Sequence, residues 1–316
     1  MKEESILDNV DEIIKSAIDK KVLVIVNTVD RAIEVFDELK QTDSNVKANL
    51  LHSMFIKKDR SLLEKRIKSF ADNEEESGIW VTTQLVEASL DIDFDYLFTE
   101  LSTLDSLFQR LGRCYRKREF DLSEPNVYVC TEEVKGVGTI YDKEVWAKSK
   151  EKIMSYDCKK ITEKDKVKMV KQLYSRENLA GSKFLKDFDN ALDYLENIEP
   201  YKRTSNEAQN LLRKINNINV IPRSIYDKII DIIEEYKTYN ITDKNRKEFK
   251  KLRREISKYT VSIPYYKATD GRVSLISEQG ERLSDIYILN RRYDFEPEEL
   301  TGKGVLIDEE LGCIIA

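Results

Sequence analysis

The sequence contains a single histidine among its 316 residues, and its four cysteines lie far apart without any CxxC pair. Zinc sites and disulfide frameworks are built from clustered cysteine and histidine residues. We therefore expect no metal site within this chain. Reduced thiols, as are usual in the cytoplasm, are the simplest interpretation of the isolated cysteines.

Long apolar stretches are also lacking. The longest early run, VLVIV at residues 22–26, is much too short to cross a bilayer. The first ten residues, MKEESILDNV, lack the basic and apolar regions of a signal peptide. The sequence therefore predicts a cytoplasmic protein with no membrane partner.

Basic residues are not in excess, because the net charge is −6 although 35% of the residues are charged. Such a chain carries no general field that attracts nucleic acid, so any such binding must depend on a local basic patch. A hydrophobic content of 41% is typical of a globular protein, and 316 residues exceed one usual domain. Two or three packed units are expected.

Helices and short apolar strands alternate through the first 135 residues. Apolar runs predict strands at 21–27, 45–52, 78–83, 95–101 and 126–131. Amphipathic spacing predicts helices at 3–19, 31–40, 59–71 and 103–114, the third with Asp59 as its N-cap. Such alternation indicates a parallel sheet covered on both faces, which binds ligands at the carboxyl ends of its strands.

The pattern changes after residue 135. Long amphipathic stretches without strands predict a helical linker over 136–204, and further helices are expected over 205–258. From residue 259 short strand-like pieces alternate with glycine-containing turns, which indicates a small closing unit. The expected fold class is therefore α/β: a parallel sheet lobe at 1–135, a helical linker, and a small α+β C-terminal domain at 205–316.

The stretch DSLFQRLGRCYR places Arg110, Arg113 and Arg116 three residues apart. On a helix or at its end these side chains project within roughly one quadrant of one another. A guanidinium group is always charged, and its rigid fork suits phosphate oxygens. The cluster is therefore a candidate phosphate site. A solvated basic patch, or an Arg110 paired with Asp93 or Glu100, also fits the spacing.

A second stretch, WVTTQLVEASLDIDFDYLF, ends a strand with Thr83 and Gln84 and continues to Asp91, Asp93 and Asp95. Hydroxyl and amide groups at the carboxyl end of a strand can bond a nucleic-acid backbone without reading its bases. A nearby aspartate can accept a hydrogen bond from a ribose hydroxyl. The spaced aspartates also suggest a calcium loop or a plain polar turn, but the EF-hand glycine and terminal glutamate are missing at the required offsets.

The stretch TQLVEASLDIDFD followed by DSLFQRLGRCYR resembles motifs V and VI of superfamily 2 helicases, and it is most similar to the CRISPR-associated helicase-nuclease of type I systems. VLVIVNTVDRAIEVFDEL and LLHSMFIKKDRSLLEKRIKSF are similar to the same family. The generic motif has an Arg-Gly pair where Ala88 and Ser89 follow Glu87 in this sequence. This departure favours the CRISPR-associated branch. The resemblance implies that residues 1–135 form a second RecA-like lobe.

The resemblance further implies half of a site for ATP with Mg²⁺. Arg113 and Arg116 occupy the places of two arginines that approach the γ-phosphate from the second lobe and stabilise the charge of its transfer. Gln109 and Gly112 belong to the same motif, in which the glutamine couples the nucleotide to the lobe interface. Asp91 occupies the place that bonds the ribose.

Contacts with the backbone of single-stranded DNA are implied as well. The resemblance assigns them to Asn27, Thr28, His52, Thr83 and Gln84. Asn27 and Thr28 have an alternative role as a helix N-cap. His52, the only histidine, has the alternative of a structural role.

Parts of a complete helicase are missing from these 316 residues. The sequence contains no phosphate loop of the form GxxxxGK[ST], and one histidine cannot supply the metal ligands of the family's nuclease domain. The chain thus resembles the C-terminal half of the enzyme. The implied partners are a first RecA-like lobe that binds most of the ATP and Mg²⁺, a nuclease domain, single-stranded DNA and the CRISPR surveillance complex. Alone, the chain is expected to lack ATPase and nuclease activity.

Two other functions stay open: a lobe of another superfamily 2 DNA or RNA helicase, and a non-catalytic nucleic-acid-binding adaptor. In the last segment, residues 236–259 interleave aromatic side chains with nine basic ones, a composition suited to a single-strand channel. The alternative is an amphipathic helix whose apolar side faces the core.

Overall fold

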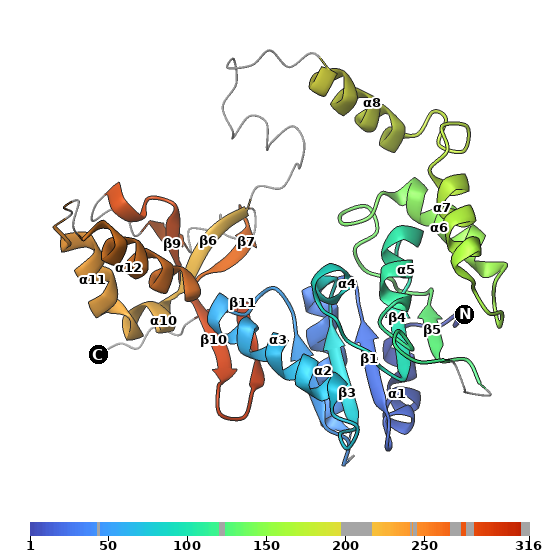
Figure 1. The fold of residues 1–316 in the computed structure, drawn as a ribbon, viewed down its shortest axis with the longest axis horizontal. Helices are drawn as coiled ribbons and strands as arrows, with labels where there is room; N and C mark the ends of the chain where they lie inside the picture. Colours follow the sequence, from blue (N-terminus) through green and yellow to red (C-terminus); the bar gives the residue numbers. More distant parts are fainter. Residues whose placement is uncertain are drawn as a thin grey trace. The chain divides into compact units, whose positions relative to one another are not determined.

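The computed structural model of the chain describes residues 1–42, 45–119, 124–196, 217–240, 242, 245–265, 273–275 and 281–310 (Figure 1). It divides into two compact units: Met1–His52 with Glu64–Leu212, and Ser53–Leu63 with Arg213–Ala316. The boundary expected at residues 204–205 lies outside the described residues. Within the described ranges, no helix is both long and apolar enough to span a membrane.

The first unit is built on a five-stranded sheet with the strand order β2-β3-β1-β4-β5. Every neighbouring pair in it is parallel, which confirms the predicted architecture. The strands are β1 (Lys21–Ile25), β2 (Ala48–Leu51), β3 (Gly78–Thr82), β4 (Tyr96–Glu100) and β5 (Val127–Cys130). Each lies within one to three residues of its predicted bounds.

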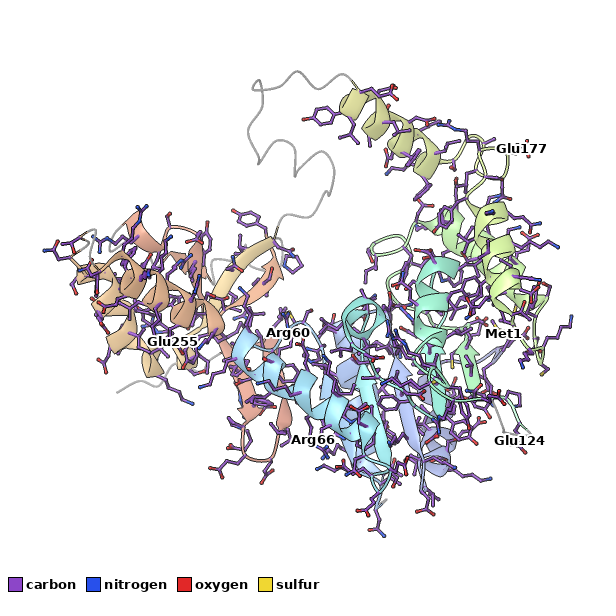
Figure 2. All side chains as sticks on the ribbon, in the orientation of Figure 1. Met1, Arg60, Arg66, Glu124, Glu177 and Glu255 are labelled. Carbon is purple, nitrogen blue, oxygen red and sulfur yellow. The ribbon has the colours of Figure 1, made fainter. Side chains whose placement is uncertain are left out.

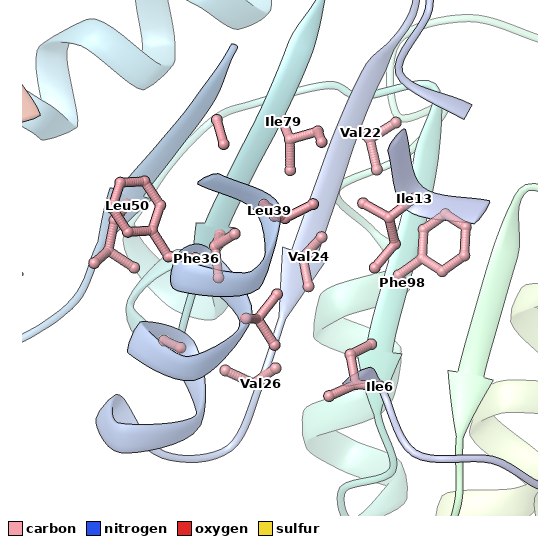
Figure 3. Close-up of a cluster of buried hydrophobic side chains, with 14 of the residues drawn as sticks. Ile6, Ile13, Val22, Val24, Val26, Phe36, Leu39, Leu50, Ile79 and Phe98 are labelled. Atoms are coloured by element: carbon pink, nitrogen blue, oxygen red, sulfur yellow. The ribbon is translucent and has the colours of Figure 1, made fainter. Parts of the chain in front are cut away.

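Helices cover both faces of this sheet. On one face, α1 (Val10–Ser16) and α2 (Val29–Gln41) pack against alternate residues of β1, as Figure 3 shows for Val22 and Val24. On the other face, α3 (Lys57–Asp72) places the ring of Phe70 at 6.3 Å from that of Trp80 on β3. All five residues of β1 are buried, because a central parallel strand has no solvent-facing side.

Three helices occupy the segment predicted as a linker: α6 (Lys143–Met154), α7 (Glu163–Leu173) and α8 (Lys183–Glu196). Val145 and Leu173, from α6 and α7, share a buried cluster with Leu104 and Leu107 of α5 (Leu104–Leu111). These apolar contacts make α6 and α7 part of the first unit.

The second unit contains a mixed four-stranded sheet with the order β7-β6-β9-β8 and a hairpin of β10 and β11. Its strands are β6 (Asn217–Pro222), β7 (Val261–Pro264), β8 (Val273–Leu275), β9 (Ile286–Leu289), β10 (Arg291–Glu296) and β11 (Thr301–Glu310). Its helices are α10 (Arg223–Lys228), α11 (Ile230–Thr238) and α12 (Arg246–Lys258).

Two features of this unit differ from the predictions. Residues 217–222 form a central strand where helix was expected, because β6 pairs with strands more than 40 residues later in the chain, β7 on one side and β9 on the other. Asp59 is not an N-cap, since α3 begins two residues earlier at Lys57. Its carboxylate instead accepts a hydrogen bond of 2.6 Å from the hydroxyl of Tyr293 on β10.

Strands β10 and β11 contact the segment 53–63 within the second unit. The hydroxyl of Tyr293 also accepts a hydrogen bond from the backbone N–H of Ile56 at 3.2 Å. The backbone N–H of Val305 donates to the carbonyl of Met54 at 3.0 Å. Neighbouring Gly304 has a φ of +70°, and a Cβ there would lie 2.6 Å from the same carbonyl, so this contact requires glycine.

Replacing Tyr293 with phenylalanine tests this junction. The variant leaves the buried carboxylate of Asp59 without its hydroxyl donor, so we expect the free energy of unfolding to fall by about 1–3 kcal/mol. The matched control is Tyr265→Phe in the same unit. The Tyr265 side chain is exposed, so we expect the loss of its hydroxyl to change the free energy of unfolding little. Urea unfolding of both variants gives the comparison, and an equal effect would contradict the assigned role of Tyr293.

Candidate functional site

Polar side chains from several strands meet at the carboxyl edge of the parallel sheet. Asn27 follows β1, and its backbone N–H donates to Oε2 of Glu100 at the end of β4, at 2.7 Å. Its side-chain amide donates to the carbonyls of Leu101 and Lys135, both at 3.1 Å. Gln84, which follows β3, donates from Nε2 to the carbonyl of Asn27 at 2.7 Å. The parallel topology therefore brings two predicted site residues, Asn27 and Gln84, into direct contact.

Arg110 on α5 lies at the centre of this edge and is fully buried. Its Nε donates to Oε1 of Glu87 at 2.8 Å, and its Nη1 to the Thr99 hydroxyl at 2.8 Å and the Glu100 carbonyl at 3.0 Å. Its Nη2 donates to Oδ1 of Asn27 at 2.9 Å and to the Tyr141 hydroxyl at 2.8 Å. A guanidinium has five N–H groups, so this one is fully satisfied inside the protein.

The three arginines of DSLFQRLGRCYR do not share one helical face, which corrects the sequence-based expectation. The helix α5 ends at Leu111, with Gly112 as its C-cap, so Arg113 and Arg116 lie beyond it. Arg110 points into the protein. Arg113 is only 8% exposed, and its guanidinium donates to backbone carbonyls of the turn that holds α4 (Leu85–Ser89), to Leu90 at 2.6 Å and to Glu87.

Arg116 is the member of the cluster that reaches solvent. Its side chain is 44% exposed and lies 3.5 Å from the carboxylate of Asp91, which is itself exposed. Lys117 approaches the same carboxylate to 3.3 Å. The hydrogen bond from Lys117, followed by the charges of Lys117, Arg116 and Arg113, lowers the pKa of Asp91 below its usual value. The predicted ribose contact, Asp91, and one predicted phosphate contact, Arg116, thus lie side by side on two neighbouring surface segments, one after α4 and one after α5.

The other two aspartates of the segment after α4 are paired with cations. Arg118 lies 3.3 Å from the carboxylate of Asp93 and 2.8 Å from that of Asp95. Asp93 also accepts a hydrogen bond from the backbone N–H of Arg116 at 2.9 Å. These pairs favour the polar-turn interpretation over a calcium loop. In the ranges that the structure describes, no group of three or more His, Cys, Asp or Glu side chains is arranged to hold a metal ion.

The remaining predicted site residues have distinct settings. Thr28 caps α2, because its hydroxyl accepts a hydrogen bond from the Arg31 backbone N–H at 3.2 Å, so the N-cap alternative is confirmed for this residue. Thr83 is buried and Gln109 is exposed on α5. The C-cap Gly112 has a φ of −71° and room for a Cβ, so its backbone does not require glycine here.

His52 lies in the interior after β2, with no exposed surface. Burial lowers the pKa of its imidazole to about 3, because the charged form loses its hydration. The side chain is therefore neutral at physiological pH.

Sequence reasoning missed three partners of Arg110, namely Glu87, Thr99 and Tyr141. The departure from the generic helicase motif lies at Ala88 and Ser89, directly after Glu87, and it did not indicate that Glu87 pairs with Arg110. The partners expected for Arg110 were Asp93 or Glu100, whereas the structure uses the Glu87 carboxylate and the backbone carbonyl of Glu100. Tyr141 gave no signal, because it lies in a segment without a recognisable motif.

The parallel sheet, with Arg110 at its carboxyl edge and Arg113 and Arg116 in the turn that follows α5, is the architecture of a second RecA-like lobe, and an accessory unit follows it. Residues 18–119 match the family described as CRISPR-associated nuclease/helicase Cas3, C-terminal. The chain is 33% identical over 215 residues to the CRISPR-associated nuclease/helicase Cas3 of Methanothermobacter thermautotrophicus, and 42% identical over 100 residues to the CRISPR-associated endonuclease/helicase Cas3 of Escherichia coli. These alignments cover 66% and 30% of this chain.

Solved structures agree with this match. The crystal structure of T. fusca Cas3-ATP has a TM-score of 0.67 at 16% identity, and the match covers 97% of this chain and 41% of that one. A chain of a CRISPR RNA-guided surveillance complex, pre-nicking, has a TM-score of 0.59 at 18% identity, with 90% and 40% covered. The chain belongs to the Cas3 family and corresponds to its C-terminal part. It spans 25% of the length of the M. thermautotrophicus relative and 11% of the E. coli relative.

The contrast between the buried and the exposed arginine predicts different costs of replacement. Arg110→Gln leaves the largely buried Glu87 carboxylate without its cation, so we expect a loss of about 3–5 kcal/mol in the free energy of unfolding. Arg116→Gln breaks an exposed ion pair, for which about 0–1 kcal/mol is expected. Urea unfolding of both variants measures the difference. Similar small losses would mean that the Arg110 network does not stabilise the lobe.

The single histidine makes stability depend on pH in a defined window. His52 has a folded pKa of about 3, below its unfolded value of 6.5, so only the unfolded chain binds this proton between those values. The contribution of His52 to the free energy of unfolding is fully present above pH 6.5. It decreases as the pH falls below 6.5, by up to about 1.4 kcal/mol per pH unit. We expect His52→Gln to remove this contribution.

Urea unfolding at pH 7.0 and at pH 5.5 measures that slope in the parent chain and in the variant. The difference between the two slopes isolates His52, because all other titrating groups are shared. Identical slopes would show that His52 titrates alike in the folded and unfolded chains.

Proposed function

We propose that this chain supplies the second motor lobe of an ATP-driven translocase on single-stranded DNA, acting in type I CRISPR interference. The observation that carries the proposal is the exposed pair of Arg116 and Asp91. Arg113 holds the turn that precedes Asp91 from inside the protein. The names of the relatives support it, since they pair nuclease with helicase, and one structural neighbour is named with ATP.

The exposed pair of Arg116 and Asp91 suits a nucleotide that the first lobe presents. Asp91 is a hydrogen-bond acceptor for ribose hydroxyls, and Arg116 is an exposed cation for phosphate oxygens. Gln109, exposed on α5, is available at the same motif. Arg113 is largely buried and donates to the carbonyls of Leu90 and Glu87, so it holds the turn that precedes Asp91. ATP supplies the free energy of phosphoryl transfer, and a first lobe would hold most of the Mg²⁺.

Burial separates the predicted DNA-contacting residues into two groups: those that can contact DNA and those that position them. Thr28 and Gln84 are partly exposed at the carboxyl edge, so we assign the backbone contacts to these two. Asn27, His52 and Thr83 are buried, so we assign them to positioning, Asn27 by holding Gln84 at its carbonyl. Backbone contacts of this kind carry no sequence preference, which agrees with a motor that moves along any strand.

The test combines the chain with a separately produced first RecA-like lobe and nuclease domain of a Cas3 relative. Alone, residues 1–316 are expected to show no ATP turnover, because the sequence has no phosphate loop. With the missing parts, turnover stimulated by single-stranded DNA is expected. Arg116→Ala should reduce it by a factor of about 10³ or more, as for other arginine fingers.

The matched control is Arg176→Ala. Arg176 is also an exposed arginine, and it pairs with Asp189 at 2.7 Å far from Arg116 in sequence. Its variant should keep full turnover, and both variants should keep DNA binding. Turnover that survives Arg116→Ala, or an active chain on its own, would overturn the proposal. Stronger stimulation by RNA would indicate an RNA helicase, and binding without turnover would indicate an adaptor.

A further inference from the structure

The helix α12 in the second unit carries a continuous basic face. Its thirteen residues, RKEFKKLRREISK, include seven basic and two acidic side chains. At 3.6 residues per turn, the six exposed cations of this helix fall within an arc of about 140°. They are Arg246, Lys247, Lys250, Lys251, Arg254 and Lys258. Figure 2 labels Glu255, which marks the helix within its unit.

The apolar side of α12 is already in use. Ile256 is fully buried, and the ring of Phe249 stacks on that of Tyr236 at 4.5 Å with an interplanar angle of 11°. Tyr239 lies 5.9 Å from the same Phe249 ring. The basic helix therefore has no free apolar face to insert into a membrane. Its aromatic rings pack on one another, so they do not form a stacking platform for unpaired bases.

Within the residues that the structure describes, few carboxylates neighbour the basic face. Glu248 accepts a hydrogen bond from the Tyr239 hydroxyl at 2.7 Å, and Glu255 pairs with Lys258 at 2.6 Å. Among the described residues, the other five exposed cations of the face form no ion pair. A row of like charges on one helix raises its own electrostatic energy, and a polyanion relieves this repulsion.

We propose that α12 binds the phosphate backbone of double-stranded nucleic acid without reading its sequence. An acidic protein surface fits less well, because the core of a protein interface is apolar and this face exposes no large apolar side chain. A duplex carries about one charge per 1.7 Å of its axis, about twice the density of one strand, and needs no stacking contact. The surface lies in the second unit and adds a duplex contact to the single-strand contacts proposed for the first.

Salt dependence of duplex binding tests the assignment. The variant is Lys247→Gln, Lys250→Gln and Lys251→Gln together, in the whole chain, with a labelled duplex of roughly 20 base pairs, about two turns. Each phosphate contact contributes about 0.9 to the slope of log K against log salt. We expect the variant to lower that slope by about 2–3 in fluorescence anisotropy titrations.

The control removes the same charge from another helix. Lys164, Lys168 and Lys171 are exposed along α7, and their three Lys→Gln changes should leave the slope unchanged. Equal slopes for the two triple variants would overturn the proposal, because they would show a response to net charge alone. A larger effect of the α12 variant on a single strand of equal length would also overturn it, in favour of a single-strand surface.

A second measurement needs no variant. Lysine acetylation read by mass spectrometry should decrease at Lys247, Lys250 and Lys251 when the duplex is added, and stay constant at Lys164 and Lys168. Protection at neither set would overturn the proposal. Neither experiment uses ATP or a first lobe, so the outcome is independent of the motor assigned to the first unit.

Discussion

A guanidinium that has no contact with water must place all five of its N–H groups on protein acceptors, and the carboxyl edge of the first unit is arranged around that requirement. Arg110 reaches the residue after β1 through Asn27, the end of β4 through Thr99 and Glu100, and the segment after β5 through Tyr141. One side chain thus connects three neighbouring strands and α4. The network thereby fixes the positions of the segments that follow these strands.

The three arginines of DSLFQRLGRCYR differ in burial, and each has a different role. Arg110 holds the strand ends together, Arg113 holds the turn after α4, and Arg116 alone is presented to solvent. Glu87 takes part in the first two roles, because its carboxylate accepts from Arg110 and its carbonyl accepts from Arg113. Glu87 therefore supplies the counter-charge that the buried Arg110 needs.

The lobe was predictable because its signals are local. Continuous apolar runs such as KVLVIV predict buried parallel strands, and their alternation with amphipathic helices predicts the layers of the lobe. The arrangement of the arginines was not predictable, since a helical wheel assumes that the helix continues, and α5 ends at Leu111. The role of Tyr141 and the strand β6 were not predicted for a related reason. Their partners lie 31 or more residues away along the chain, and no periodicity within a window reveals them.

The contact of segment 53–63 with β10 and β11 also affects how the protein is made. The bond from Tyr293 to Asp59 joins residues 234 positions apart. At about 5–20 residues per second, a ribosome completes the second partner roughly ten seconds to a minute after the first. During that interval the buried run Met54, Phe55 and Ile56 has no cover from its own unit, although it is already synthesised. The nascent chain therefore carries an apolar segment that a chaperone can bind until the C-terminal strands emerge.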